Sequence, residues 1–442
     1  MTQLTVLGGA NEIGGNKLLL EDRGTRVFLD FGQSFNFGER YFTEYLGPRE
    51  RFGLRDHLAL DLLPRLSGLY SREMLAPTDL RYGPSEFHAV FLSHIHFDHT
   101  SHIRFIDPSI PVHLGETGKR MLDAWEESGR DSLGEHDYRT FRTGKRVRID
   151  DIEVEPIHVD HSTPSAYGFI VHTSDATVAY TGDFRLHGPM ARNTRDFIER
   201  ARKARVDTLV CEGTRVAPRD KRQNLSEQGV VDRCDKIIGG TKKLVLTTFY
   251  PRDIDRMKSF HRLAVKHDRV FVVSSRVAYL LHALKDDPRI EVPDPLTDEH
   301  MGVYCRELLR TDEWERPLRG AGLGAEDIRK DPSSYILHLQ FSHLGELVDI
   351  RPPRGSPFIR SMSEPFEEDD IEDEVLRNWM ARFALELHQA HASGHCSMAE
   401  VFGAVEEIAP KRIVPVHTEH QELFRERFGG RVVLPAKGPM RV

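Results

Sequence analysis

The sequence predicts a mixed α/β protein in which a domain of stacked β-sheets is interrupted by a second domain with a mainly parallel sheet. In the first half, short β-branched or apolar runs are broken by Gly, Pro or Asp, with few helices between them. From Val206 onward, strand-like runs alternate with helical stretches. Histidines that directly follow strands reappear late in the chain. We therefore expect the C-terminal part to fold back and complete the site of the first domain.

The expected strands of the first half are short and end at turn-forming residues. They cover residues 3–7, 16–20, 25–30, 89–93, 147–149, 152–159, 167–172 and 177–181. The glycine-rich segment 8–16 resembles a phosphate-binding loop at first sight. Such a loop needs a helix start after the glycines, whereas residues 17–21 have the pattern of a strand. We interpret the segment as a hairpin turn.

The second half has the alternation of a βαβ domain. Strands are expected at 208–210, 243–247, 269–273 and 335–341, and helices at 226–238, 253–265, 277–285 and 371–388. The stretch 286–332 is rich in Pro, Gly and charge, which indicates an irregular excursion from that domain. We divide the chain into a first domain over residues 1–207, an inserted domain over 208–386, and a return to the first domain over 387–442.

Composition describes an ordinary globular protein rather than a membrane protein. The 442 residues are 39% hydrophobic and 29% charged, and no stretch approaches the roughly 20 apolar residues that a membrane span requires. Residues 1–6 have neither a basic region nor a long apolar run, so we expect a cytoplasmic protein without a membrane partner. The four cysteines lie far apart without C-x-x-C spacing, which argues against disulfides and against a thiolate zinc site.

A net charge of -8 argues against a protein that coats nucleic acid through bulk positive potential. A local binding groove remains compatible with it. Residues 192–222 are basic and residues 364–374 are densely acidic. For each run, a role in binding and a solvated helix face or loop stay open as alternatives.

A cluster of histidines and an aspartate directly follows the apolar run 89–92. The segment reads Ser93-His94-Ile95-His96-Phe97-Asp98-His99. Imidazole and carboxylate groups suit zinc and related divalent metals, and residues two apart on an extended segment point the same way. His94 and His96 are therefore expected to hold one metal while Asp98 and His99 face a second.

Three further apolar runs also end at a metal-ligating residue type. They stop at His161, at Asp183 and at His417, and a glycine before Asp183 permits a close backbone approach. The shared pattern raises all three above the usual reading of an isolated polar residue as structural. Asp30 closes another strand, and we expect it to orient a ligating imidazole rather than bind metal. His187 we interpret as an ordinary strand or surface histidine.

Together these residues resemble the metal motifs of the metallo-β-lactamase superfamily. Glu212, His395 and His417 are further similar to the three extra motifs of its β-CASP nucleases. Within that group, His391-x-Ser393-Gly394-His395 with Val414-Pro415-Val416-His417 most resembles ribonuclease J and its short relatives. The resemblance implies an αββα metallo-β-lactamase sandwich with an inserted Rossmann-like β-CASP domain. Because the DNA-repair branch usually lacks the last histidine, His417 favours RNA.

The resemblance also implies a ligand set, a substrate and an activity. One zinc would lie on His94, His96 and His161, and another on Asp98, His99 and His417, with Asp183 bridging and Mn²⁺ or Mg²⁺ as substitutes. The substrate would be single-stranded RNA, with 5′-to-3′ exonuclease and endonuclease activity both open. The sequence departs from the family pattern in two ways. No separate C-terminal domain follows residue 442 in this sequence, so whether the protein forms a homodimer stays open. Residues 361–368 replace a glycine-rich loop of the family's inserted domain.

The expected mechanism is attack of water on phosphorus, which yields 5′-phosphate and 3′-hydroxyl ends. Asp98 and Asp183 are expected to hold the attacking water, and His395 to donate to the phosphorane or the leaving oxygen. Glu212 would orient that arrangement. A pocket for a 5′-terminal phosphate is one interpretation of His391, Ser393 and Gly394, and a purely structural turn is the other. A DNA nuclease, a small-molecule hydrolase of the same fold and a non-catalytic RNA-binding protein are the competing functions.

Overall fold

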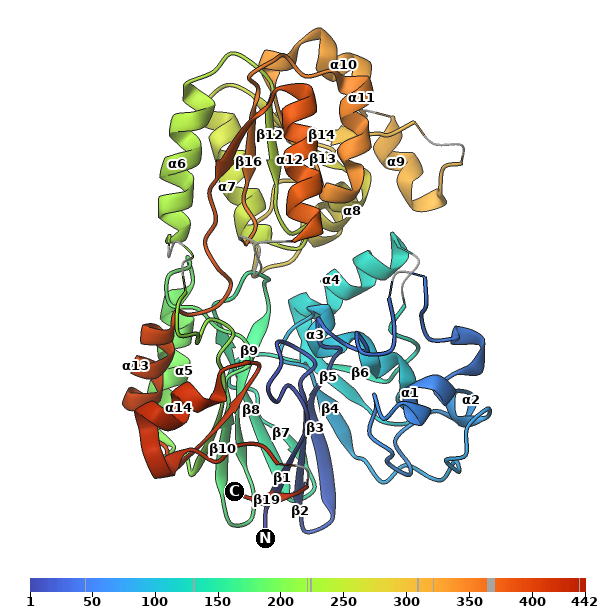
Figure 1. The fold of residues 1–442 in the computed structure, drawn as a ribbon, viewed down its shortest axis with the longest axis vertical. Coiled ribbons are helices and arrows are strands. Elements are labelled where there is room, and N and C mark those ends of the chain that lie inside the picture. The colour runs from blue at the N-terminus through green and yellow to red at the C-terminus, as the bar shows by residue number, and fades with distance from the viewer. Residues whose placement is uncertain are drawn as a thin grey trace.

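Two bodies make up the protein in the computed structural model, which describes residues 1–43, 45–129, 132–220, 222, 225–307, 310–320, 322–363, 370–436 and 438–442. The lower body in Figure 1 holds two sheets and both ends of the chain, and the upper body holds a third sheet. We call them the two-sheet body and the inserted domain; the inserted domain runs from residue 227 to residue 389. No helix in the described ranges combines the length and the apolar character that a membrane crossing needs.

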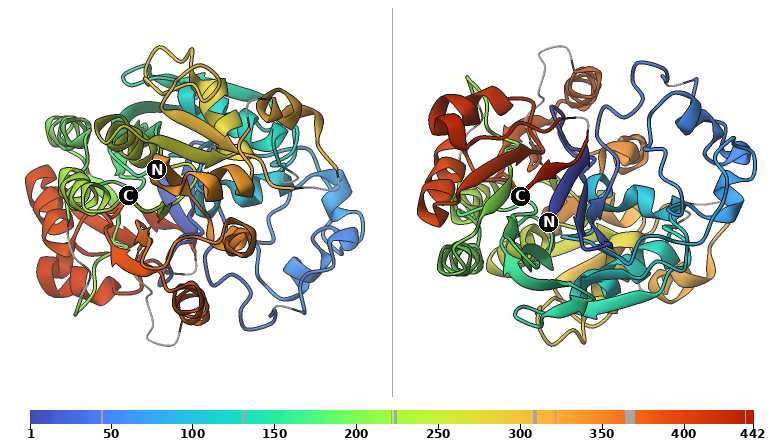
Figure 2. Two further views of the ribbon diagram at one scale, coloured as in Figure 1. Left: turned by 90° about the horizontal axis from the view of Figure 1, so that it is seen from above. Right: turned by 90° about the horizontal axis from the view of Figure 1, so that it is seen from below.

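The first sheet has seven strands in the order β19-β1-β2-β3-β4-β5-β6. Neighbouring strands from β19 to β3 are antiparallel, and those from β3 to β6 are parallel. Their bounds are β1 Gln3–Gly8, β2 Lys17–Asp22, β3 Thr25–Phe31, β4 Ala89–Phe91, β5 Val112–Gly115, β6 Tyr138–Phe141 and β19 Met440–Arg441. Because β19 pairs with β1, the two chain ends lie side by side, as Figure 2 shows from below.

The second sheet has six strands in the order β18-β11-β10-β9-β8-β7. Its strands are β7 Val147–Ile149, β8 Ile152–Val159, β9 Ala166–His172, β10 Thr177–Tyr180, β11 Thr208–Glu212 and β18 Arg412–Val416. Strands β10, β11 and β18 run parallel to one another. Apolar side chains from both sheets, among them Leu18, Leu29, Phe169 and Tyr180, form one buried cluster between them. The hydrophobic alternation of these strands thus stabilises a sandwich.

Helices cover the outer faces of the sandwich. The second sheet is covered by α5 (Ala191–Lys203), α13 (Met398–Ile408) and α14 (Gln421–Phe428), whose buried side chains form one cluster with that sheet. The first sheet is covered by α4 (Glu116–Glu127) and by short helices. These are α1 Arg55–Ala59, α2 Arg72–Leu75 and α3 Phe97–Thr100. The layers therefore follow the order α, β, β, α, which confirms the expected sandwich.

The inserted domain contains a third, six-stranded sheet in which all pairs are parallel. Its strands, in chain order, are β12 Val245–Thr248, β13 Val270–Ser274, β14 Met301–Tyr304, β15 Tyr335–His338, β16 Pro357–Arg360 and β17 Glu386–Gln389. Its helices are α6 Glu227–Gly239, α7 Ile254–Lys266, α8 Ser275–Leu284, α9 Arg316–Arg319, α10 Ala325–Lys330, α11 Leu347–Ile350 and α12 Ile371–Phe383. This parallel sheet with helices on it confirms the expected inserted α/β domain.

Several details differ from the sequence-based expectations. Residues 208–212, which we assigned to the inserted domain, form β11 of the second sheet, because they pair with β10 and β18. The stretch 286–332 is not wholly irregular, since β14 lies within it and extends the third sheet. The expected helix 371–388 ends at Phe383, and β17 follows it. Of the acidic run 364–374, residues 364–369 lie outside the described residues.

Packing joins the two bodies. One buried apolar cluster includes Val90 of the first sheet, Met121 of α4 and Leu281 of α8. At the same contact, Arg276 of α8 donates a hydrogen bond of 2.9 Å to the carbonyl oxygen of Trp125. The inserted domain is therefore seated on the two-sheet body.

Candidate metal centre

The expected metal ligands all lie at strand ends on one edge of the sandwich. His94 and His96 follow β4, and His161 follows β8. Asp183 follows β10 and His417 follows β18. The carboxyl ends of parallel strands meet at one edge of a sheet, so residues distant in sequence arrive together. The segment after β4 turns into α3, which carries two further expected ligands, Asp98 and His99.

The ring nitrogens of His94, His96 and His161 form a first group of potential ligands. His96 Nδ1 lies 3.0 Å from His94 Nε2 and 3.1 Å from His161 Nε2. The Nδ1 atom of His161 donates to the carbonyl oxygen of Gly394 at 2.6 Å, which leaves Nε2 facing the group. A Cβ atom on Gly394 would lie 2.9 Å from His161 Cε1, so a glycine at that position permits the contact.

Asp98, His99, Asp183 and His417 form a second group, and all four side chains are buried. Asp98 Oδ2 lies 3.0 Å from His417 Nε2 and 3.5 Å from His99 Nε2. Asp183 Oδ2 lies 3.2 Å from His99 Nε2 and 3.7 Å from His417 Nε2. The same oxygen lies 3.7 Å from His94 Nε2 and 3.8 Å from His161 Nε2. Asp183 is therefore placed between the two groups.

The donor set fits divalent metal ions. The Nε2 atom of His99, which faces the second group, is buried, yet it has no hydrogen-bond partner within the described parts of the chain. A buried polar atom without a partner costs free energy, and a metal ion in the second group would satisfy this one. Imidazole nitrogens with carboxylate oxygens suit zinc and its first-row neighbours, and a lone bound water would not use so many of them.

The electrostatics of the first group favour metal binding. Burial lowers the pKa of His94 and His96 well below the usual value and that of His161 to about 3. These three imidazoles are therefore neutral at pH 7, which is the state that a metal requires.

In the second group the charges partly neutralise one another. Burial alone would lower the pKa of His417, but Asp183 and Asp98 raise it to about 9. Against the effect of burial, the neighbouring imidazoles hold the pKa of Asp98 and Asp183 well below the usual range. The carboxylates are thus ionised and available to a cation.

Asp30 lies directly behind the second group and is fully buried. One carboxylate oxygen accepts from the Ser93 backbone N–H at 2.6 Å, and the other accepts from the Ser93 and Tyr180 hydroxyls at 2.7 Å each. His99 Nδ1 lies 2.7 Å from the same second oxygen. Since a carboxylate only accepts, His99 donates from Nδ1 and presents Nε2 to the group. The backbone φ of Asp30 is 58°, a conformation that non-glycine residues adopt infrequently.

The glycine-rich segment 8–16 joins the antiparallel strands β1 and β2, as a hairpin connection does, but it also supports the site. Gly9 accepts a 2.7 Å hydrogen bond at its carbonyl oxygen from the His417 backbone N–H, and Gly15 donates one of 2.9 Å to the Asp98 carbonyl. At Gly14, whose φ is 76°, a Cβ atom would lie 2.8 Å from Asp98 Oδ2. Only glycine allows the backbone to approach this carboxylate so closely.

A hydrogen-bonded chain links Glu212 to two site histidines. His395 Nδ1 lies 3.0 Å from Glu212 Oε1, and the Thr214 hydroxyl lies 2.7 Å from Glu212 Oε2. His417 Nδ1 lies 2.8 Å from the same hydroxyl. Because the Thr214 proton goes to the carboxylate, the hydroxyl oxygen accepts from His417. Burial opposes the charge of Glu212, but His395 keeps its pKa below the usual value.

His395 belongs to a third group of potential ligand atoms together with His161 and Asp183. Its Nδ1 atom lies 3.9 Å from Asp183 Oδ2. Its side chain is 20% exposed, so it borders solvent at the mouth of the centre. The structure thus brings together Asp98, Asp183, Glu212 and His395, the four residues for which we expected catalytic roles.

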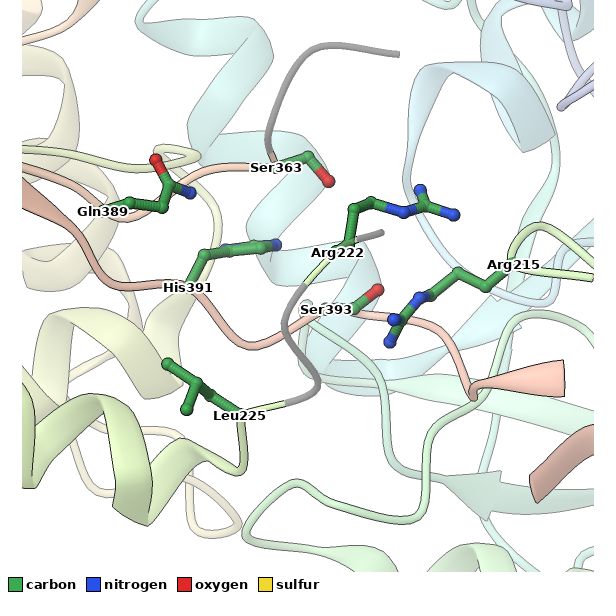
Figure 3. A pocket seen from close by; sticks show the side chains of 7 residues that line it. All are labelled: Arg215, Arg222, Leu225, Ser363, Gln389, His391 and Ser393. Carbon is green, nitrogen blue, oxygen red and sulfur yellow. The ribbon is translucent and has the colours of Figure 1, made fainter. Parts of the chain in front are cut away.

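A pocket beside the centre is lined by His391 and Ser393, two of the three residues expected to bind a terminal phosphate. Figure 3 shows them on one segment, with the side chains of Arg215 and Arg222 nearby. Asp220 accepts from both guanidiniums, at 2.9 and 2.7 Å. Gly394 does not line this pocket and lies against His161 instead.

Sequence reasoning missed several residues that hold the site. Thr214, Ser93 and Tyr180 have no signal in the sequence beyond their position near strand ends. His187, which we expected to be an ordinary strand or surface histidine, contacts the segment that carries His395: its side chain is 8% exposed, and its Nε2 lies 3.0 Å from the Ser393 carbonyl oxygen. Arg252 of the inserted domain also reaches the site and donates to the Ile95 carbonyl at 2.9 Å, between the first two ligands.

Comparisons with known proteins agree with this fold. Residues 61–247 match the Beta-lactamase superfamily domain, and residues 380–435 match the Zn-dependent metallo-hydrolase RNA specificity domain. Ribonuclease J of Sinorhizobium meliloti is 23% identical over 355 residues, which cover 76% of this chain and 58% of that protein. Ribonuclease J of Mycobacterium tuberculosis is 25% identical over 446 residues, covering 94% of this chain and 68% of that protein.

Ribonuclease J of Helicobacter pylori is 20% identical, covering 96% of this chain and 57% of that protein. The chain thus spans less than two thirds of the length of some of these relatives. The crystal structure of a protein of unknown function from Enterococcus faecalis superposes with a TM-score of 0.80 at 22% identity, covering all of both chains. That likeness shows the fold alone.

Proposed function

We propose that this chain, which has the metallo-β-lactamase fold and carries an RNA specificity domain, is a metal-dependent ribonuclease. The observation that carries the proposal is the convergence of two ligand groups on Asp183, with the pair of Glu212 and His395 at their mouth. A small-molecule hydrolase of this fold has no use for that pair or for the inserted domain. The match to an RNA specificity domain favours RNA over DNA.

We assign two divalent cations, zinc by the nature of the ligands, to these groups. One would lie on His94, His96 and His161, and the other on Asp98, His99 and His417, with Asp183 shared. When bound, such a pair supplies neutralisation of phosphoryl charge and a nucleophile at neutral pH. Mn²⁺ and Mg²⁺ are the substitutes to test beside zinc.

The side chains of the site have separate tasks in hydrolysis. The ionised carboxylates of Asp98 and Asp183 accept hydrogen bonds and would orient the attacking water toward phosphorus. His395 donates from Nδ1 to Glu212, so its Nε2 is directed to the substrate side and would donate to the phosphorane or the leaving oxygen when protonated. Glu212 orients the His395 ring, because its buried carboxylate oxygen lies 3.0 Å from Nδ1. Water attack leaves 5′-phosphate and 3′-hydroxyl ends.

The pocket at His391 and Ser393 is our candidate for the 5′-terminal phosphate of single-stranded RNA. Among the described residues that line this pocket are Arg215 and Arg222, whose guanidiniums are the kind of donor that binds a phosphate dianion. Gly394 contributes indirectly by allowing the segment to pass close to His161. A terminal phosphate held here would favour 5′-to-3′ exonuclease cleavage, while internal cleavage would need the pocket to be bypassed.

The test uses RNA labelled at its 5′ end with monophosphate, triphosphate or hydroxyl termini, and DNA of the same sequence. We expect zinc-loaded protein to cleave the RNA, fastest with a 5′-monophosphate, and to release labelled mononucleotide at once. Longer labelled fragments would instead indicate endonuclease cleavage. Chelation and Asp98→Ala should each abolish cleavage. The control is Asp22→Asn, which replaces a buried carboxylate at the end of β2 and should leave cleavage intact. A 2′,3′-cyclic phosphate product or a fully active Asp98→Ala variant would contradict the proposal.

A further inference from the structure

Two exposed phenylalanine rings stand at the edge of the metal centre. Phe97 lies between the ligands His96 and Asp98 and begins α3; its exposed fraction is 36%, whereas that of Asp98 is 4%. Phe35, on the segment after β3, is 64% exposed. The two rings pack edge to face with centroids 4.8 Å apart and an interplanar angle of 81°.

The backbone holds this pair in place. Gln33 donates a 3.4 Å hydrogen bond to the Phe97 carbonyl, and Phe35 donates one of 3.3 Å to the Ile13 carbonyl. At Gly32 a Cβ atom would lie 1.8 Å from the Asp98 carbonyl oxygen, so the segment that carries Phe35 is pressed against α3. The rings are therefore fixed relative to the metal ligands.

Core packing does not account for the pair. Within the described residues, neither ring is a buried member of any of the four apolar clusters. Exposed aromatic rings forgo the free energy that burial would provide, and nearby Phe37 shows the alternative, because it packs against the core. An occupant that covers the rings would recover this free energy.

The position of the rings identifies the occupant. α3 lies at the end of the two-sheet body that faces the inserted domain (Figure 1). Phe97 directly follows His96 of the first group and directly precedes Asp98 of the second, so its backbone lies beside both groups. Aromatic rings stack on nucleobases of every sequence, because each base has a π-face.

We infer that Phe35 and Phe97 form a stacking platform for an unpaired nucleobase next to the cleaved phosphodiester of RNA. This inference rests on the proposed ribonuclease function and names how the substrate is seated. Stacking would orient the phosphate toward the ligand groups without reading the base. Stacking would also favour nucleic acids as substrates over phosphodiesters that have no nucleobase.

The test compares RNA with bis(p-nitrophenyl) phosphate, which has no nucleobase, in metal-loaded wild type, Phe35→Ala, Phe35→Trp and Tyr82→Ala. Tyr82 is a control, since it is 38% exposed but packs on Arg72 of α2. In Phe35→Ala we expect kcat/KM for RNA to fall about 5- to 100-fold relative to the nitrophenyl substrate. Phe35→Trp should restore the wild-type ratio, and Tyr82→Ala should leave it unchanged.

An RNA series with one abasic ribose moved through the sequence identifies the base. Wild type should lose activity on the RNA with the abasic position next to the cleaved bond, and Phe35→Ala should lose nothing further there. Equal changes on both substrates, or indifference to every abasic position, would overturn the inference while leaving RNA cleavage by wild type intact. A change of oligomeric state in Phe35→Ala would assign the rings to a second copy of the chain instead. If wild type cleaves no RNA, it is the proposed function that fails.

Discussion

Replacement of Glu227 by glutamine should destabilise the whole protein through one buried ion network. Glu227 Oε1 lies 2.7 Å from Arg185 Nη1 and 2.9 Å from Arg256 Nη2, and both arginines are fully buried. Arg185 also donates at 2.7 Å to Asp160, the neighbour of the ligand His161. One carboxylate on α6 thus joins a guanidinium of the two-sheet body to a guanidinium of the inserted domain.

The expected magnitude follows from the pairing. Burial disfavours the charge of Glu227, but Arg256 and Arg185 lower its pKa from 4.5 to about 2. A shift of that size corresponds to about 3 kcal/mol, and breaking a buried ion pair typically costs about 3 to 5 kcal/mol. Glutamine has the same shape but no charge, and its amide would turn a donor toward Arg256. We expect the free energy of unfolding at pH 7 to fall by about 3 kcal/mol.

Urea unfolding of the metal-loaded protein, followed by tryptophan fluorescence, measures this change. The control is Asp235→Asn, which breaks an exposed pair with Lys266 of 2.8 Å and should cost less than about 1 kcal/mol. The wild-type contribution of Glu227 should be present above pH 4.5 and disappear as the pH falls toward 2, because its folded pKa is the lower one. A Glu227→Gln loss no larger than that of the control would refute the reasoning.

Two further predictions concern buried carboxyls with opposite roles. Burial raises the pKa of Asp253 from 3.8 to about 7, so between these pH values the carboxyl is protonated in the folded state and ionised in the unfolded state. The free energy of unfolding therefore falls as the pH rises through this range. Asp253→Asn keeps the hydrogen bond from the Arg256 backbone N–H that caps α7. The free energy of unfolding of this variant relative to wild type should rise by about 2 kcal/mol from pH 5.5 to 8, as thermal unfolding measures it. A difference that stays constant over this range would contradict the prediction. Asp30→Asn should weaken zinc binding about 10- to 100-fold in chelator competition, with Asp22→Asn as the control. Equal affinity for zinc in both variants would contradict a role of Asp30 in metal binding.

The candidate metal ligands were predictable because each ends an apolar run or lies in the histidine-rich segment 94–99 directly after one. A strand that stops at His161, Asp183 or His417 has a local signal, and parallel strands place such ends at one edge. The sandwich was predictable for a related reason, since short alternating strands have to cover one another's apolar faces. The alternation of strands and helices after Val206 predicted the second domain and its mainly parallel sheet, and the family resemblance then identified that domain as an insertion of the β-CASP type.

Long-range pairing set the limit of the prediction. The residues of β11 are all buried, and their pairing with β10 and with β18, the latter about 200 residues later, assigns them to the second sheet. Thr214 has no local signal either, because it matters only where β18 brings His417 beside it. The same holds for Arg252, whose target Ile95 lies in the other body.

The connections between the two bodies explain why stability and chemistry should be linked. The first leaves β11 directly after Glu212, and the second, from β17 to α13, contains His395. Both connections therefore carry members of the site, and Arg256 holds the second one through the Ala392 carbonyl at 3.4 Å. A shift of the inserted domain would move His395 relative to Asp183 before any ligand left its strand. Loosening of the buried network at Glu227 should thus slow proton donation at His395 even while the ligand groups stay assembled.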